Sequence, residues 1–296
     1  MSDALVLFGF TGDLANKKIF PALYAMSKRG ELVPRVVGVA GRTQSDDEVH
    51  QRVRDSIEQH GGGIDDGPAF DKLVHAIRYV GGDYNKSGTF EALKKALAGS
   101  RRPAHYLAVP PTLFETVIQG LGRSGLAKDA RLIVEKPFGR DLASAKELDA
   151  VAQSVFPAEA IFRIDHYLGK EAIMNLLYFR FSNSFLEPLW CREHITSVQM
   201  TMSETFGVEE RGAFYESAGA LRDVVENHLF QIVALLAMEP PKSRAFADLQ
   251  DAKADVFEAM QSQGCFDQHR VAGGKGVTGS GTYVCPQIVQ PDCPRQ

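Results

Sequence analysis

Near its N-terminus the chain reads Leu5-Val6-Leu7-Phe8-Gly9-Phe10-Thr11-Gly12-Asp13-Leu14-Ala15, and this segment carries most of the information about the fold class. Its first four residues form an unbroken apolar run of strand length, which is typical of a parallel strand buried on both faces. Glycines follow at once, and after them comes a helical pattern of apolar residues at Ile19, Leu23 and Met26. A buried strand that enters a helix through glycines is the opening of a βαβ unit.

Strand and helix patterns continue to alternate through residues 1–140. Apolar strand runs are expected at residues 36–40, 79–80, 105–109 and 131–134, with helices between them. The helix expected at 45–60 begins with Ser45-Asp46-Asp47-Glu48, which predicts a capping box. Regular βα alternation is typical of a doubly wound parallel sheet, so we predict an α/β, Rossmann-like domain over residues 1–140.

The pattern changes after residue 141. Residues 142–155 and 218–237 have helical periodicity, whereas residues 196–204 alternate between apolar and polar side chains. Such alternation predicts a half-buried antiparallel strand, so we expect the front part of an α+β substrate and dimerisation domain over residues 141–261. Residues 262–296 contain no leucine and no glutamate and are rich in glycine and proline. We expect a poorly ordered tail there.

Composition excludes several classes of protein. The 296 residues include 33 Lys and Arg against 37 Asp and Glu, a net charge of −4, which argues against nucleic-acid binding through bulk charge. The longest apolar runs, such as residues 232–238, are far shorter than the roughly 20 residues of a membrane-spanning helix. No basic segment precedes the first apolar run, so no signal peptide is expected. We expect a cytoplasmic protein with neither a membrane nor a nucleic-acid partner.

The first loop has the spacing Gly9-x-x-Gly12-x-x-Ala15, which lacks the middle glycine of the usual dinucleotide loop. Gly9 can still form the tight turn, Gly12 allows a pyrophosphate to approach the backbone, and Ala15 is small enough for helix–strand packing. The alternative is a glycine turn that binds nothing. After the second strand the chain has Arg42 and no acidic residue before Asp46, which favours NADP over NAD because an arginine accommodates the 2′-phosphate.

Three more motifs follow in order: Glu135-Lys136-Pro137-Phe138-Gly139, the run from Arg163 to Glu171 that contains Asp165-His166-Tyr167-Leu168-Gly169-Lys170, and Arg222-Asp223-x-x-x-Asn227-His228. Together with the glycine loop they resemble the glucose-6-phosphate dehydrogenase family over about residues 5–260. The resemblance implies oxidation of the C1 hydroxyl of glucose 6-phosphate to the lactone, with hydride transfer to NADP or, in some members, NAD. Another Rossmann sugar-phosphate oxidoreductase would have no reason to carry the motif around His166.

The resemblance also assigns roles to residues. It makes His228 the base for the hydroxyl proton, a role that suits an imidazole, and Asp165 the carboxylate that orients it. Without the match, His228 would be taken for an ordinary histidine on a helix surface. The implied phosphate ligands are His166, Tyr167 and Lys170, Lys136 contacts both substrate and cofactor, and Glu204 and Asp223 hold sugar hydroxyls. The implied cofactor contacts are Gly9, Thr11, Gly12, Asp13, Leu14, Arg42, Asp83, Tyr84 and Lys136.

The chain departs from the family in two places. The family places an arginine where this chain has Gly41, and here Arg42 comes one residue later. The family also continues for well over a hundred residues past Met238-Glu239-Pro240-Pro241, with more substrate-binding cations, strands and dimer interface. Only Ala272-Gly273-Gly274-Lys275 follows here, and we do not count it as the family's Arg-x-Gly-Lys motif.

These departures predict a truncated or frame-shifted product with reduced activity. The alternative function is a catalytically silent remnant that binds a dinucleotide or a partner. Members of the family form homo-oligomers, but the sequence does not predict an oligomeric state here because most interface elements are missing. No metal is expected, since the spacings of Cys265, His269, Cys285 and Cys293 match no tight ligand pair.

Overall fold

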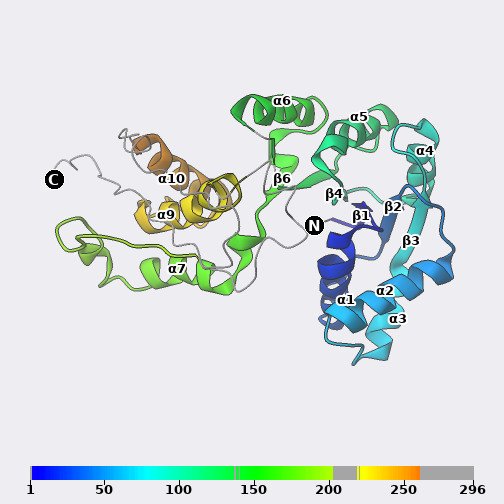
Figure 1. The fold of residues 1–296 in the computed structure, drawn as a ribbon, viewed down its shortest axis with the longest axis horizontal. Helices are drawn as coiled ribbons and strands as arrows, with labels where there is room; N and C mark the ends of the chain where they lie inside the picture. The colour runs from blue at the N-terminus through cyan, green and yellow to red at the C-terminus, as the bar shows by residue number, and fades with distance from the viewer. Residues whose placement is uncertain (1, 137, 140, 203–218, 220, 261–296) are drawn as a thin grey trace, which may run out of the picture. The chain divides into compact units, whose positions relative to one another are not determined.

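The computed structural model describes residues 2–136, 138–139, 141–202, 219 and 221–260 (Figure 1). The chain divides into two compact units, Met1–Ile164 and Asp165–Gln296. Within the described residues, no helix combines the length and the apolar character that crossing a membrane requires.

The first unit is built on a six-stranded sheet in which every pairing is parallel. Its order is β3-β2-β1-β4-β5-β6, which confirms the predicted doubly wound α/β fold. The central strand pairs on both sides, with Leu5 opposite Val36 and Phe8 opposite Leu107. The strands are β1 Ala4–Phe8, β2 Val36–Ala40, β3 Ile77–Gly81, β4 Pro103–Leu107, β5 Arg131–Glu135 and β6 Ile161–Ile164.

Helices cover both faces of this sheet and form two apolar cores. Successive strand residues point to opposite faces, so Leu7 packs with Phe20 in one core and Phe8 packs with Phe90 in the other. The first core lies under α1, α2 and α3, and the second under α4, α5 and α6. The helices are η1 Ala15–Ile19, α1 Phe20–Lys28, α2 Asp46–His60, α3 Gly67–Ala76, α4 Ser87–Ala96, η2 Pro111–Leu113, α5 Phe114–Ser124, α6 Leu142–Gln153 and η3 Ala158–Ala160.

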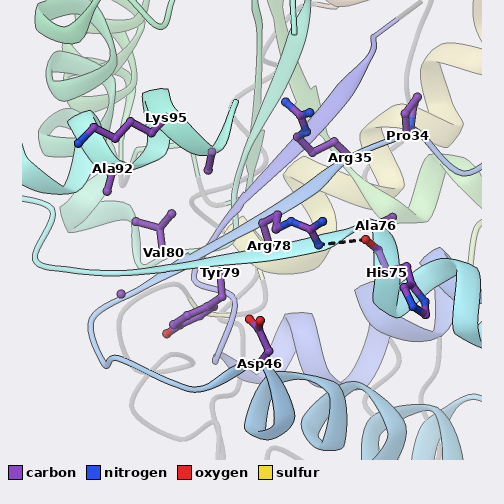
Figure 2. Close-up of a pocket in the computed structure, with 12 residues that line it drawn as sticks. Pro34, Arg35, Asp46, His75, Ala76, Arg78, Tyr79, Val80, Ala92 and Lys95 are labelled. Carbon is purple, nitrogen blue, oxygen red and sulfur yellow. Dashed lines mark hydrogen bonds between the residues drawn. The ribbon is translucent and has the colours of Figure 1, made fainter. Parts of the chain in front are cut away.

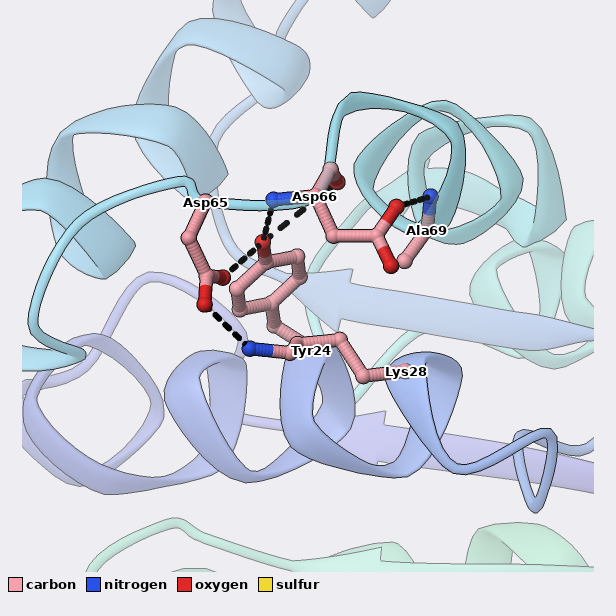
Figure 3. A network of polar contacts seen from close by, with 5 residues as sticks. All are labelled: Tyr24, Lys28, Asp65, Asp66 and Ala69. Atoms are coloured by element: carbon pink, nitrogen blue, oxygen red, sulfur yellow. Dashed lines mark hydrogen bonds and ion pairs between the residues drawn. The ribbon is translucent and has the colours of Figure 1, made fainter.

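Local capping agrees with the sequence analysis at α2. The Ser45 hydroxyl accepts from the Glu48 amide, and the Glu48 carboxylate accepts from the Ser45 amide at 2.7 Å, so the predicted capping box is confirmed. Figure 3 shows a second polar contact, in which the Tyr24 hydroxyl of α1 donates to the Asp65 carboxylate and accepts from the Asp66 amide, both at 2.8 Å. This network joins α1 to the start of α3.

The first unit extends beyond the boundary that the sequence analysis placed at residue 140. β6 pairs with β5 from Leu132 opposite Ile161 to Glu135 opposite Ile164, and Phe156 lies fully buried in the core under α5 and α6. A helix and a strand that the sequence pattern assigned to the second domain therefore belong to the compact unit that ends at Ile164.

The second unit is helical in the part that the structure describes. Its small core contains Ile173, Leu235 and Ala252 from three helices, together with Met238 directly after one of them. The expected helix at 218–237 is found from residue 221 onward as a π-helical segment that continues directly into α9, and residues 218 and 220 lie outside the described residues. The elements are η4 His166–Gly169, α7 Glu171–Phe181, η5 Glu187–Leu189, η7 Leu221–Leu229, α9 Phe230–Ala237 and α10 Phe246–Ala259.

The predicted antiparallel strand at 196–204 is wrong for residues 196–202, which have no regular secondary structure. Val198, expected on the buried face, is 56% exposed. A strand is stable when neighbouring strands satisfy its backbone hydrogen bonds, and the described part of this unit contains no strand to pair with it. Residues 203–204 and the predicted tail at 262–296 lie outside the described residues.

Candidate active site

The glycine loop lies where the strand order of the sheet reverses. The chain moves outward from β1 to β2 and β3, then returns to the other side of β1 with β4. Gly9 follows β1 and Ala108 follows β4, and the Ala108 amide donates to the Phe8 carbonyl at 3.0 Å. Ligands of doubly wound sheets bind at the carboxyl ends of the strands at such a reversal.

The backbone of this loop needs glycine for two reasons. Gly9 has a φ of +81°, and a Cβ there would lie 2.1 Å from the Ala108 carbonyl oxygen. The Gly12 amide donates to the Gly9 carbonyl at 2.9 Å, which closes a tight turn directly before the helix. The first amides of a helix have no intrahelical acceptor. A glycine turn that leads into such amides leaves room for a phosphate group and offers it hydrogen-bond donors. Of the loop side chains predicted to contact a cofactor, Thr11 and Asp13 are exposed and Leu14 is half-buried.

Tyr84 lies against the same loop, but its hydroxyl is engaged by the backbone. It accepts from the Gly9 amide at 3.1 Å and donates to the Val39 carbonyl at 3.0 Å, while its ring meets Phe8 edge-on. Burial raises the pKa of the Tyr84 phenol, so the group is neutral at physiological pH. Tyr84 therefore holds the loop to the ends of β1 and β2.

Asp83 and Arg42 are both exposed near the carboxyl ends of β3 and β2. The Asp83 carboxylate accepts from the backbone amide of Asn85 at 2.9 Å and from its side chain at 3.0 Å, and these bonds lower the pKa of Asp83. The Arg42 carbonyl accepts from the Tyr79 hydroxyl, which ties the loop after β2 to β3. The structure places Arg42 two residues beyond the end of β2, at the same edge of the sheet as the glycine loop.

Lys136 directly follows β5 at this edge and is half-buried. Its neighbour Glu135 accepts a short hydrogen bond from the Tyr106 hydroxyl on β4. Burial and the Glu135 carboxylate together raise the pKa of Tyr106. The sequence did not indicate Tyr106 as a partner of Glu135, because nothing in the pattern of β4 shows that this side chain reaches the neighbouring strand.

The second unit brings together four of the predicted site residues. His228 Nδ1 lies 3.2 Å from Asp165 Oδ2, and the two side chains are only 7% and 16% exposed. Asp165 Oδ1 accepts from the Tyr167 amide at 3.0 Å, so both carboxylate oxygens are held. The Tyr167 ring lies against the imidazole, with the centroids 4.5 Å apart, and Lys170 Nζ lies 4.5 Å from the Tyr167 ring.

This arrangement defines the chemistry available to His228. A carboxylate at Nδ1 favours the imidazole tautomer that carries its proton on Nδ1, so that the lone pair lies on Nε2. His166 and Asp223 lie in η4 and η7, but the structure does not describe their side chains, and Glu204 lies outside the described residues.

A cavity of about 640 Å³ lies elsewhere, beside the edge strand β3 (Figure 2). Arg35, Arg78 and Lys95 are among its lining residues, and none of the predicted site residues is. The Arg78 guanidinium donates to the carbonyls of His75 and Ile77, at 3.0 and 2.8 Å. The Arg78 cation is thus already bonded to the backbone. Because of this, and because the lining contains no predicted site residue, we do not assign the cavity to the active site.

A parallel sheet with a glycine loop at its strand-order reversal defines the class of dinucleotide-binding α/β proteins. Residues 6–175 match the family described as glucose-6-phosphate dehydrogenase, NAD binding domain, and residues 177–279 match the C-terminal domain of the same enzyme. The chain belongs to the glucose-6-phosphate dehydrogenase family. The second match includes residues 262–279, which the sequence analysis set apart as a tail.

Curated relatives agree with this family. The chain is 45% identical over 259 residues to glucose-6-phosphate 1-dehydrogenase 1 of Mycobacterium tuberculosis, covering 88% of the chain and 55% of that protein. It is 37% identical over 275 residues to the cytoplasmic isoform of Solanum tuberosum, covering 87% of the chain and 53% of the relative. The chain thus spans about half the length of the curated relatives it matches.

Two solved structures share the fold. The enzyme from Mycobacterium avium superposes with a TM-score of 0.81 at 44% identity, over 88% of this chain and 57% of that one. A glucose-6-phosphate dehydrogenase in complex with its substrate glucose 6-phosphate superposes with a TM-score of 0.78 at 34% identity, over 88% of this chain and 56% of that one.

Proposed function

We propose that this chain oxidises the C1 hydroxyl of glucose 6-phosphate to the lactone, with NADP as hydride acceptor. The observation that carries the proposal is the buried contact between His228 Nδ1 and Asp165 Oδ2, in a chain of the glucose-6-phosphate dehydrogenase family. Loss of a hydride and a proton from one carbinol needs a base beside the hydroxyl group, and the pair supplies that base.

In the proposed reaction His228 Nε2 accepts the proton of the C1 hydroxyl as the carbonyl forms. The Asp165 carboxylate stabilises the resulting imidazolium through Nδ1, and Tyr167 packs against the ring and limits its rotation. NADP bound at the glycine loop would supply the acceptor for the hydride that leaves C1. The proton then leaves from His228 to solvent, which returns the base to its neutral form.

We assign substrate binding to the residues around this base. Lys170, Tyr167 and His166 would hold the phosphate dianion, because a cation and hydrogen-bond donors from one short segment suit such a group. Lys136 would contact the substrate and the cofactor, and Asp223 and Glu204 would accept from sugar hydroxyls.

The cofactor assignment rests on the glycine loop. Gly9, Gly12, Thr11, Asp13 and Leu14 would surround the pyrophosphate, since the turn leaves no room for a Cβ at Gly9 and ends at a helix N-terminus. Arg42 would donate hydrogen bonds to the 2′-phosphate, which favours NADP, and NAD remains the second choice. Asp83 would lie near the cofactor, and Tyr84 would support the loop.

The test measures NADPH formation from glucose 6-phosphate and NADP. We expect the wild-type chain to form NADPH and the His228→Asn variant to lose at least about 100-fold in rate, because a general base contributes that much or more. His194→Asn is the matched control, since His194 is an exposed histidine of the same unit. Binding of NADPH without any sugar-dependent turnover would support the silent dinucleotide-binding alternative and overturn the proposed activity.

We also infer a cytoplasmic location, the compartment that the name of the potato relative states for that protein. Fractionation of the source cells would test this inference, and recovery of the chain in another compartment would contradict it.

A further inference from the structure

The edge strand β3 carries backbone groups that face away from the sheet. The Gly82 amide donates to the Ala40 carbonyl at 2.9 Å, so residue 82 faces β2. In a parallel pair the backbone groups of successive residues face alternate sides, which turns those of Tyr79 and Gly81 away from β2. Because β3 is the last strand of the sheet, two amides and two carbonyls on that side have no partner within the described residues.

The start of the same edge is already closed. The Ile77 amide donates to the Val74 carbonyl, and the Arg78 guanidinium donates to the Ile77 carbonyl at 2.8 Å. Capped or short edges protect a sheet from pairing with other chains. Here the protection ends after the first residue of the strand, so the open part of the edge covers residues 79–81.

The cavity of about 640 Å³ lies along this open part of the edge (Figure 2). Its lining includes residues 78–81 of β3 and, from α4, Ala92, Lys95 and Ala96, whose spacing places them on one face of the helix. The two alanines leave space beside the strand. An added strand needs its backbone only about 4.8 Å from that of its neighbour, so the cavity can hold an extended segment.

Positive charge is concentrated on one side of this edge. Arg35, Arg78 and Lys95 line the cavity, and Figure 2 shows all three on the side of β3 where α4 lies. The alternation of the strand agrees, because Val80 packs on this side in the same core as α4. Tyr79 and the carboxylate of Asp46 lie on the other side of the strand.

We propose that the edge of β3 binds an extended acidic peptide, which adds to the sheet as a further strand. The peptide backbone bonds the open groups of Tyr79 and Gly81. The peptide side chains that face α4 are aspartate or glutamate, because they meet the three cations of the cavity. None of the lining residues is among the predicted site residues, so this inference does not depend on the proposed function.

Charge and backbone chemistry favour this occupant over two others. A phosphate dianion only accepts hydrogen bonds, whereas the open edge offers both donors and acceptors. A second copy of the chain would bring another Arg78 and another Lys95 to the same strand, and like charges opposite one another destabilise a sheet. An acidic peptide in the extended conformation satisfies both the backbone and the charge.

The test measures the solvent exchange of backbone amides by NMR in the full chain. The probe is a hexapeptide of alternating valine and glutamate with blocked ends. At about 1 mM peptide we expect the amides of Tyr79 and Gly81 to exchange at least about threefold more slowly, because they gain acceptors. The amides of Arg78 and Val80 face β2 and should exchange as before. Unchanged exchange at Tyr79 and Gly81 would overturn the inference.

Two control peptides separate the backbone from the charge. The same peptide with every amide N-methylated keeps the charge and loses the donors, and a peptide of alternating valine and lysine keeps the backbone and reverses the charge. Neither should slow exchange at Tyr79 and Gly81. Equal slowing by the N-methylated peptide would show that an anion binds without pairing, and equal slowing by the lysine peptide would show that charge is not recognised. Either result rejects the proposed partner.

Lys95→Glu tests the site on the protein. Fluorescence anisotropy of the labelled acidic peptide should show binding about fivefold weaker than in the wild type, because an attractive charge becomes repulsive. Lys128→Glu changes an exposed lysine outside the lining by the same charge and should bind as the wild type does. Circular dichroism establishes that both variants are folded. Equal weakening in the two variants would reduce the effect to net charge and contradict the site.

The oligomeric alternative has its own outcome. If the amides of Tyr79 and Gly81 exchange more slowly as the protein concentration rises, without any peptide, a second copy occupies the edge. That result would reject the acidic peptide as the partner.

Discussion

At the scale of single residues, the Tyr84 side chain connects the glycine loop to β2 and packs against β1. It bonds Gly9 on one side and Val39 on the other, and its ring packs on Phe8. The resemblance to the family implied a cofactor contact for Tyr84. That contact stays a prediction, and the hydrogen bonds add a structural role in which the side chain holds the loop against β2.

Tyr84→Phe removes this hydroxyl and little else. We expect NADPH to bind about fivefold more weakly, the equivalent of about 1 kcal/mol, because the loop loses one of its anchors. Fluorescence titration with NADPH measures the effect. Tyr24→Phe is the control, since the Tyr24 hydroxyl also makes two close contacts but joins α1 to α3. Equal losses of affinity in the two variants would contradict a specific role for Tyr84.

His105 shows a second effect of a single buried side chain. It is fully buried between Phe8 and Phe156, with Nε2 2.9 Å from the Leu126 carbonyl. Burial lowers the pKa of His105 to about 4, whereas an unfolded histidine titrates near 6.5. The unfolded state therefore binds the proton first, and stability falls as the pH drops from about 6.5 toward 4.

We expect His105 to lower the free energy of unfolding by about 2 kcal/mol at pH 5 relative to pH 8. Urea unfolding at both pH values measures it in the wild type and in His105→Gln, whose amide can still donate to Leu126 but does not titrate. The free energy of unfolding of His105→Gln should depend less on pH than that of the wild type. His75→Gln, which changes an exposed histidine, should show the same pH dependence of this free energy as the wild type. An equal pH dependence in His105→Gln would rule out the buried histidine as its source.

At the scale of elements, the turn between β1 and the first helix depends on the approach of the neighbouring loop. The loop after β4 brings the Ala108 carbonyl to where a Cβ of residue 9 would lie. The motif spacing indicated that the turn needs a glycine at position 9, but the neighbouring loop that excludes a side chain there became known only from the sheet order.

Gly9→Ala should therefore be severe. The positive φ and the clash with Ala108 together cost more than about 2 kcal/mol, and NADPH binding should be lost as the loop shifts. Thermal unfolding and NADPH titration measure the two effects. Gly41→Ala is the matched control, because a Cβ at Gly41 meets nothing within 4 Å. Near-wild-type affinity in Gly9→Ala would show that this turn does not carry the cofactor.

At the scale of the whole molecule, residues beyond position 140 complete the sheet and the core of the first compact unit. The first unit takes β6 and the buried Phe156 from beyond residue 140, so its sheet and core end at Ile164. The compact unit defined by contacts is therefore longer than the segment with regular βα alternation.

Residues 1–164 produced alone should fold cooperatively and bind NADPH about as well as the full chain. Residues 1–140 should not, because they lack the strand that pairs with β5 and the side chain that fills the core beneath α5. Circular dichroism, urea unfolding and NADPH titration compare the two fragments. Equal stability of the shorter fragment would place the boundary at residue 140 after all.

Local patterns were sufficient for much of this protein. The buried run at residues 5–8, the glycine spacing behind it and the Ser45–Glu48 box depend on neighbours in the chain, so local sequence was enough to specify the strand, turn and helix there. The Asp165–His228 contact was also predicted, through a resemblance carried by short motifs that lie 63 residues apart.

Features that depend on distant partners could be established only from the packing of the folded chain. The place of β6 in the first sheet and the Tyr84 bonds to the glycine loop are both contacts between segments far apart in sequence. Residues 196–202 show the converse, since their alternating pattern finds no strand to pair with in the described residues. Periodicity reports which face of an element is apolar, but the packing of the whole chain determines which partner covers that face.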